Sequence, residues 1–287
     1  MIKNPRSFDH AVLPVESLAA ARSRHEALGF TVAPEARHPF GTENCCIFFE
    51  DGTYLEPLGI NQREDCEASA RAGNGFTAHD QAFRFRNGEN GFSALAFLSE
   101  DAKADRDEFV RSEILAANNL TFSRSFEMPD GSMEEGRFEL TFTRDRRAPD
   151  IMLFCCQDIH MPKAGKSVLA EHKNGVQGIA EIILSEQNPS DFQYYLQNVM
   201  DNRDTPSSSL GMEIAAANVN INVLTPEGLR MQFGVEREAC DRGLRLEGIV
   251  FDGGCPPEDS LLRSHGRYAI ADRKPGQGAF YAFTDTP

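Results

Sequence analysis

Short apolar runs that end in polar residues recur along the chain. Three of them cover residues 11–15, 94–98 and 180–184, and each leads toward a stretch with helical spacing. A run of this length fits a β-strand, and the Ser and Glu residues that close each run favour the start of a helix. The pattern therefore predicts a repeated strand–helix unit.

The helix of the first unit has the clearest pattern. It is predicted over residues 17–28, where Leu18, Ala21 and His25 share one face. Gly29 follows, and glycine readily adopts the left-handed conformation that ends many helices. The second helix is predicted to start near residue 105 and to end at residues 118–119. The third is predicted over residues 190–200.

Further strand-like runs follow the predicted helices, so the unit is a β-α-β-β-β repeat. In the third unit, a turn at residues 225–228 is predicted to join the last two runs as a hairpin. The polar stretch 61–91 is predicted to be a long excursion or an interface loop. The runs are 31–36, 44–49 and 54–60; 121–126, 137–143 and 151–157; 219–224 and 229–235; and, in a shortened fourth unit, 244–251, 267–271 and 279–283.

Composition and charge narrow the classes of partner. The 287 residues carry 29 basic and 44 acidic side chains, which gives a net charge of −15. An acidic surface repels phosphate backbones and anionic lipids, so we expect neither a nucleic acid nor a membrane as partner. The sequence contains no run of 18 apolar residues, so we expect no transmembrane helix. The seven cysteines lack CxxC spacing, which favours reduced thiols and a cytoplasmic protein.

Two polar side chains interrupt apolar strands in the first unit. His10 lies in the strand predicted around residues 8–15, and Glu56 lies in the strand 54–60. Burying such groups is costly unless they have partners. An imidazole and a carboxylate suit Zn, Ni, Fe, Mn or Co ions, and strands can direct both groups at one point. A metal-free His–Glu hydrogen-bonded pair is the alternative interpretation.

Several motifs, in this order and spacing, resemble the glyoxalase/vicinal-oxygen-chelate superfamily and, more narrowly, bacterial glyoxalase-like domain proteins. They lie at residues 8–12, 27–30, 38–39, 41–44, 54–56, 154–157 and 172–179. The resemblance implies an α+β fold of tandem βαβββ modules whose curved mixed sheets surround a cleft. It also implies a divalent metal, bound by side chains from the first and fourth strands of paired modules.

The repeat and the resemblance together predict two pairs of modules. The first pair spans residues 1–162, with modules at 8–60 and 92–157. Residues 163–175 form a linker. The second pair spans residues 176–287, with modules at 176–235 and 244–284.

Alignment of the units on the first one gives candidate ligands. His10 and Glu56 occupy the two ligand positions of the superfamily, whereas Ser93 and Phe154 occupy them in the second unit. In the third unit they are occupied by Ile179 and Gln232, and an amide oxygen can bind a metal.

Two further residues are candidates at this site. Glu181 lies two residues beyond Ile179 and is the predicted catalytic base, although a solvated edge-strand position explains it equally well. His172 is a candidate ligand from a loop, although a solvated histidine is the commoner case.

Other residues are candidates for contacts with a small-molecule substrate. His38 and Asn44 flank the turn 39–42 and match the family pattern, or they only stabilise that turn. Arg137, Phe154 and Gln157 lie on predicted strands of the second unit. Arg137 is able to hold an anionic group with two hydrogen bonds, and a surface ion pair is the alternative.

The resemblance leaves several functions open. The first is a divalent-metal-dependent lyase or isomerase that acts on a small carbonyl or vicinal-oxygen compound. A non-catalytic protein that binds a small molecule is the alternative, and it is favoured by the lost ligand positions. A ring-cleaving dioxygenase needs two histidines and one carboxylate, and only His10 matches such a position. A homodimer, or a dimeric scaffold, is also compatible with the sequence.

Overall fold

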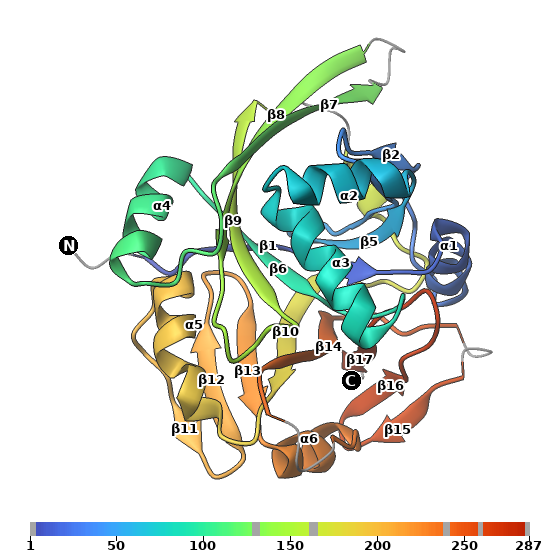
Figure 1. Ribbon diagram of the computed structural model, residues 1–287. Coiled ribbons are helices and arrows are strands. Elements are labelled where there is room, and N and C mark those ends of the chain that lie inside the picture. Colours follow the sequence, from blue (N-terminus) through green and yellow to red (C-terminus); the bar gives the residue numbers. More distant parts are fainter. Residues whose placement is uncertain (1–3, 128–132, 161–165, 238–241, 258–260, 285–287) are drawn as a thin grey trace.

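A computed structural model describes residues 4–127, 133–160, 166–237, 242–257 and 261–284 of the chain. Two curved mixed sheets pack on each other, with helices around them (Figure 1). The predicted α+β fold is thus confirmed. No helix within these ranges is long and apolar enough to cross a membrane.

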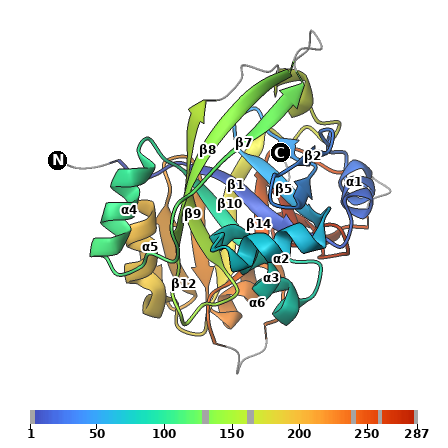
Figure 2. The ribbon, with the colours of Figure 1, turned by 45° about the horizontal axis from the view of Figure 1, so that its top comes forward.

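Sheet A is built from the first two units of the repeat, in the order β2-β3-β5-β1-β6-β9-β8-β7, with β4 added beside β5. The long hairpin of β7 and β8 extends beyond the rest of the sheet (Figures 1 and 2). The strands are β1 (Phe8–Pro14), β2 (Ala36–Arg37), β3 (Thr42–Asn44), β4 (Ile47–Phe48), β5 (Tyr54–Ile60), β6 (Ala94–Leu98), β7 (Leu120–Glu127), β8 (Met133–Thr143) and β9 (Met152–His160).

Sheet B follows the same plan, in the order β11-β12-β13-β10-β14-β17-β16-β15. In both sheets, the first strand of a unit pairs parallel with a later strand of that unit and antiparallel with the first strand of the next. The strands are β10 (Gly178–Ser185), β11 (Ser207–Ser208), β12 (Gly211–Ala215), β13 (Asn220–Leu224), β14 (Arg245–Asp252), β15 (Arg263–His265), β16 (Tyr268–Ala271) and β17 (Phe280–Thr284).

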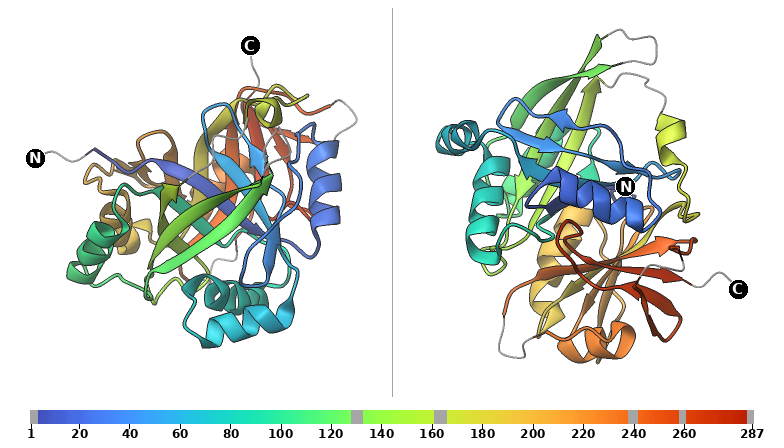
Figure 3. Two further views of the ribbon diagram at one scale, coloured as in Figure 1. Left: turned by 90° about the horizontal axis from the view of Figure 1, so that it is seen from above. Right: turned by 90° about the vertical axis from the view of Figure 1, so that its right-hand side faces the viewer.

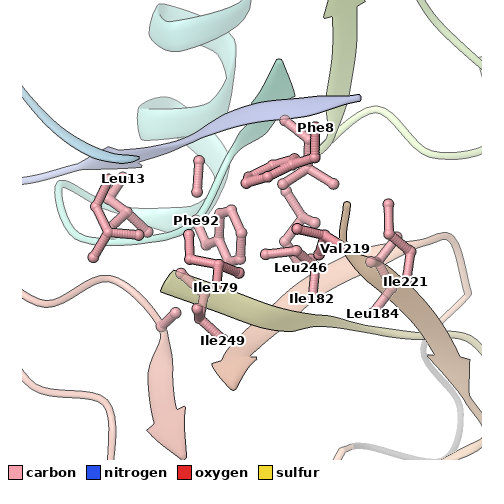
Figure 4. Packing of buried hydrophobic residues seen from close by; sticks show 14 of the residues in the cluster. Phe8, Leu13, Phe92, Ile179, Ile182, Leu184, Val219, Ile221, Leu246 and Ile249 are labelled. Atoms are coloured by element: carbon pink, nitrogen blue, oxygen red, sulfur yellow. The ribbon is translucent and has the colours of Figure 1, made fainter. Parts of the chain in front are cut away.

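The main hydrophobic core lies between the two sheets. Phe8 and Leu13 of β1 point toward Ile179 and Ile182 of β10 and Ile249 of β14 (Figure 4). Complete burial of such a side chain contributes about 1.5–3 kcal/mol. Smaller clusters cover the opposite, concave face of each sheet. One face of each sheet is therefore committed to the core, and the other is available for a site.

Four of the α-helices, α1, α3, α4 and α6, begin at a side-chain cap that the sequence supplies, and not always where the apolar pattern alone placed them. α1 starts after Ser17, whose side chain accepts a hydrogen bond from the backbone of Ala20, and Gly29 follows with φ of +84°. α4 starts after Asp101 and ends at residue 111, earlier than predicted. Its buried face includes Phe109. The helices are α1 (Leu18–Ala27), α2 (Arg63–Arg71), α3 (Gly75–Asn87), α4 (Ala102–Arg111), α5 (Gln193–Met200) and α6 (Pro226–Phe233), with 3₁₀ turns at Lys166–Ala170 and Pro189–Phe192.

The stretch 61–91 forms two helices between β5 and β6, so the prediction of an interface loop is wrong, and the stretch is a helical excursion from the sheet. α2 and α3 pack together beside sheet A (Figure 2). Asn74 begins α3, because its side chain accepts hydrogen bonds from the backbone of Phe76 and Thr77. Phe76, Asp80 and Phe83 are buried, a helical spacing hidden among many polar residues.

The predicted hairpin at residues 219–235 is also wrong, because residues 229–233 belong to α6 and not to a strand. The side chain of Thr225 accepts a hydrogen bond from the backbone N–H of Gly228, and Pro226 occupies the first turn. These residues form a helix N-terminus, in which the N–H that proline lacks is not needed. Gly234 ends the helix with φ of +62°. The predicted strand 31–36 contributes only Ala36 to β2.

A buried histidine connects α1 to the last strand of sheet B. His25 Nδ1 lies 2.8 Å from the carbonyl oxygen of Ala21, and Nε2 lies 2.8 Å from the hydroxyl of Tyr281. α1 thus lies where both sheets meet (Figure 3). Burial lowers the pKa of His25 to about 4, so the neutral ring is the folded form.

Acid should destabilise the protein through its buried histidines. Burial lowers the pKa values of His25, His38 and His79 to about 4, whereas unfolded histidine titrates near 6.5. Between these values the unfolded chain binds more protons. This contribution to the free energy of unfolding is therefore complete above about pH 6.5 and is lost as the pH falls toward 4.

Thermal denaturation followed by circular dichroism at about pH 7 and about pH 5 tests this expectation. The His25→Asn variant should lose less stability over this interval than the wild type, because it lacks one of the rings whose pKa burial lowers. An equal loss in the two proteins would contradict the assignment of His25.

Candidate functional site

The concave face of sheet A forms a small, partly open cavity of about 40 Å³. Its walls come from β1, β3, β5, β7, β8 and β9, from the segment between β2 and β3, and from α3. A volume of this size holds an ion or one or two water-sized groups. The polar lining residues are His10, His38, Asn44, Tyr54, Glu56, Arg124 and Cys156.

His10 and Glu56 both face this cavity. β1 and β5 pair in parallel with His10 opposite Tyr54 and Val12 opposite Glu56. Side chains alternate along a strand, so the two residues share the concave face. His10 Nε2 lies 3.5 Å from Glu56 Oε2, and each residue is only 5% exposed. The expectation that adjacent strands bring these two side chains together agrees with the structure.

The buried pair is charged at neutral pH in the absence of a metal. Burial disfavours both charged forms, but hydrogen bonds with Asp9 and Glu56 outweigh burial and raise the pKa of His10 to about 9. Burial likewise opposes ionisation of Glu56, yet His10 and Asn44 lower the pKa of its carboxyl group to about 2. The Asp9 carboxylate lies 2.7 Å from His10 Nδ1 and fixes the orientation of the ring.

His38 approaches the other oxygen of the same carboxylate. Its Nε2 lies 3.6 Å from Glu56 Oε1, and its Nδ1 lies 2.9 Å from the hydroxyl of Thr42. The Asn44 amide donates a 2.6 Å hydrogen bond to Glu56 Oε1. Burial lowers the pKa of His38 to about 4, so this ring is neutral. His38 and Asn44 therefore do more than stabilise the turn.

The donor set fits a divalent cation. Two ligands that each bind a zinc-sized ion at about 2.1 Å lie roughly 3 to 3.5 Å apart, and the Nε2 atoms of His10 and His38 lie 3.5 and 3.6 Å from the Glu56 oxygens. The Nδ1 atom of each ring faces an oxygen of Asp9 or Thr42, as is usual for histidines that bind metals. Within the described ranges, no three His, Cys, Asp or Glu side chains already meet at one point. An ion would therefore have to draw the two rings toward Glu56.

Aromatic rings surround these polar groups. Tyr54 stacks on His10 with ring centroids 4.4 Å apart, and Phe154 meets His10 edge-on at 5.6 Å. Across the cavity, Phe122 of β7 contacts the rings of Phe40 and His38 at 5.3 and 5.9 Å. These last contacts join the two ends of sheet A. Phe154 thus lines the cavity.

Arg124, and not Arg137, lines the cavity. β7 and β8 pair with Phe122 opposite Phe138 and Ser123 opposite Arg137. Because faces alternate along a strand, Arg124 shares the cavity face with Phe122 and Phe138. Arg137 belongs to the opposite face and is exposed. The expectation that Arg137 forms a wall of the cleft is thus corrected, and the correction follows from strand register.

Gln157 and His172 have structural roles outside the cavity. Gln157 Oε1 accepts a hydrogen bond from the backbone of Ala102, and its amide donates to the carbonyl of Glu100 at the start of α4. His172 Nδ1 accepts a hydrogen bond from the backbone of Thr31, and its Nε2 lies 3.0 Å from the carbonyl oxygen of Phe48. With both ring nitrogens engaged, His172 has no position for a metal.

Glu181 is the counterpart of His10 in sheet B. It lies opposite Asn220 in the parallel pair of β10 and β13, as His10 lies opposite Tyr54 in sheet A. The predicted alignment of Ile179 with His10 is therefore wrong by two residues, because Glu181 and not Ile179 occupies the corresponding position. A register shift between Ile179 and Glu181 in the pairing of β10 with β14 accompanies this displacement.

Neither Glu181 nor Gln232 reaches the cavity of sheet A. Glu181 shares its strand face with Ile183, which belongs to the cluster on the concave face of sheet B. Its carboxylate accepts a 2.7 Å hydrogen bond from the amide of Asn222, and burial raises its pKa. Gln232 is exposed on α6. The proposed base and the proposed amide ligand are therefore both separated from His10 by the inter-sheet core.

Comparison with known protein families shows the family to which the chain belongs. The family model described as a glyoxalase-like domain matches residues 8–200, which is more than half of the chain. The chain belongs to the glyoxalase-like domain family. The predicted relation to the vicinal-oxygen-chelate superfamily is thereby confirmed. None of the curated protein sequences matches this glyoxalase-like chain.

Solved structures share the fold at low sequence identity. A hypothetical protein from Staphylococcus aureus is 13% identical to this chain, with a TM-score of 0.69. The superposition covers 96% of this chain and 98% of that protein. A triple mutant of 4-hydroxymandelate synthase from Streptomyces coelicolor is 11% identical, with a TM-score of 0.58. The superposition covers 98% of this chain and 92% of that protein. A Mn(II)-bound glyoxalase from Novosphingobium aromaticivorans is 8% identical, with a TM-score of 0.50. The superposition covers 98% of this chain and 82% of that protein. At these identities the likeness shows a common fold.

Replacing Asp9 should alter the titration of His10 in this glyoxalase-like site. In Asp9→Asn, the imidazolium loses a negative neighbour, so the pKa of His10 should fall from about 9 by about one unit or more. NMR titration of the His10 ring in chelator-treated protein measures the change. Asp107→Asn, at an exposed position of α4, is the matched control. An unchanged His10 titration in Asp9→Asn would rule out the assigned contact.

Proposed function

We propose that the cavity of sheet A is a divalent-metal site at which a small oxygen-containing compound is converted in a lyase or isomerase reaction of glyoxalase type. The observation that carries this proposal is the position of Glu56 between two histidine Nε2 atoms, at 3.5 and 3.6 Å, inside a buried cavity. When His38 Nδ1 donates to Thr42, the lone pair of Nε2 faces a carboxylate oxygen. In this tautomer, a positive ion between the two electron-rich atoms would stabilise the arrangement.

The side chains around the cavity would have different roles in this site. His10, His38 and Glu56 would hold the ion, which supplies Lewis-acid polarisation of a substrate oxygen when bound. Asp9 keeps the His10 ring in orientation, and the Asn44 amide does the same for the Glu56 carboxylate. The phenylalanines of the walls provide an apolar surrounding, in which electrostatic interactions are stronger than in bulk water.

One observation also favours the ring-cleaving dioxygenase as a second candidate. That reaction uses two histidines and one carboxylate on one iron ion, and His38 supplies the second histidine that strand positions alone did not provide. Oxygen consumption with Fe²⁺-loaded protein and a catechol separates this candidate from an isomerase, which uses no oxygen.

Metal content should depend on the three proposed ligands. Protein purified without chelator is expected to carry about one divalent ion per chain. His10→Ala and Glu56→Ala should abolish binding, and His38→Ala should weaken it about tenfold or more, because each removes a direct ligand. Elemental analysis and Co²⁺ titration measure both effects.

Gln232→Ala provides the control, because this residue is exposed on α6, away from the cavity. Its metal content should equal that of the wild type. If the wild type is isolated without metal and also rejects added Zn²⁺, Ni²⁺, Mn²⁺ and Fe²⁺, the metal-dependent function fails, and a small-molecule binding protein becomes the better account.

A further inference from the structure

The wall that β7 gives to the sheet A cavity is held less firmly than the other strand walls. In the described part of the chain, β7 pairs on one side only, with β8, whereas β1, β3, β5, β8 and β9 each pair on both sides. The described pairing of β8 with β9 begins at Arg137, and its register shifts between Arg137 and Phe138. Beyond this point the hairpin is a two-stranded ribbon, which extends past the rest of the sheet (Figure 2). Such a ribbon has little stability of its own.

Phe122 joins this wall to the other end of sheet A. Its ring meets the rings of Phe40 and His38 edge-on, with centroids 5.3 and 5.9 Å apart and planes at 80° and 84°. Within the hairpin, the same ring stacks on Phe138 at 5.3 Å, so Phe122 and Phe138 belong to one packed unit. Edge-on ring contacts are individually weak compared with a row of strand hydrogen bonds. Phe122 is therefore positioned to hold the wall in place and also to release it.

The size of the cavity requires one wall to move if an organic molecule is to enter. A volume of about 40 Å³ holds an ion or one or two water-sized groups, and a carbon skeleton does not fit beside the ion. Displacing a strand that is paired on both sides would break the backbone hydrogen bonds of a ladder. Displacing the hairpin at Phe122 would break side-chain contacts while β7 and β8 remain paired.

We propose that the β7–β8 hairpin is a gate of the sheet A cavity and that Phe122 is its latch. The cavity widens and admits the substrate when Phe122 leaves Phe40 and His38, and it narrows again when the ring returns. The purpose of the gate rests on the proposed function, whereas its motion can be tested without it. Because the latch lies against His38, a proposed ligand of the ion, the gate and the ion site share a residue.

Cys156 can report the state of the gate in the absence of any ion. It lines the cavity from β9 and is only 6% exposed. N-ethylmaleimide is larger than the resting cavity, so we expect it to react with Cys156 when the gate is open. Peptide mass spectrometry of chelator-treated protein measures the rate of modification at each cysteine. Cys155, the preceding residue, lies in the core between the sheets and serves as the internal control.

Phe122→Ala removes the latch and should accelerate the modification of Cys156 about fivefold or more, as expected for the loss of two ring contacts. Phe85→Ala is the matched control, because Phe85 lies on α3 with its side chain 92% exposed. It should leave the rate at Cys156 unchanged, and Cys155 should react slowly in all three proteins. If Phe122→Ala does not fold, Phe122→Leu keeps much of the apolar volume, lacks the ring and tests the same expectation.

The gate is ruled out if Cys156 reacts equally fast in the wild type and in the folded Phe122 variant. It is also ruled out if Cys155 accelerates by the same factor as Cys156, because β9 would then be unfolding. The labelling needs no ion, so a wild type that binds no divalent metal removes the proposed function and leaves this test intact. Conversely, a wild type that binds metal but whose Cys156 labelling does not depend on Phe122 keeps the proposed function and loses the gate.

Discussion

The alternation of side chains along β1 is the constraint on which the rest of the structure depends. Ala11 and Leu13 enter the core between the two sheets, while Val12 belongs to the cluster on the concave face. Since this core fixes which face of β1 is buried against sheet B, the face that carries His10 has to point into the cavity. A shift of one residue would bury the imidazole between the sheets. The stability of the fold and the position of the site are therefore set by the same register.

The sequence was sufficient for features that depend on a single strand or helix. His10 and Glu56 stand out because each interrupts an apolar run, and both lie where expected. Features that depend on the pairing of strands could not be predicted from the sequence. The choice between Arg124 and Arg137 requires the register of a hairpin, and the place of Glu181 requires knowing which face of β10 meets sheet A. His38 lies outside the strands, so no periodicity linked it to Glu56.

Helix capping explains the errors in secondary structure. Thr225 and Pro226 fit both a tight turn and the first turn of a helix, and only the hydrogen bond from Gly228 distinguishes the two. Around Asn74 the polar composition concealed a helix whose buried face is narrow. In both places the local sequence permits two conformations, and packing against a sheet selects one of them.

The ring contacts of Phe122 with Phe40 and His38 have a consequence for access. They bridge the ends of sheet A, between which the described residues form no strand pairing. Each aromatic contact is worth about 0.5–1.5 kcal/mol, far less than a row of strand pairs. The two ends of sheet A are therefore held together by side chains and not by strand pairing of the described residues. A separation of these ends would break ring contacts alone and would widen the cavity between them.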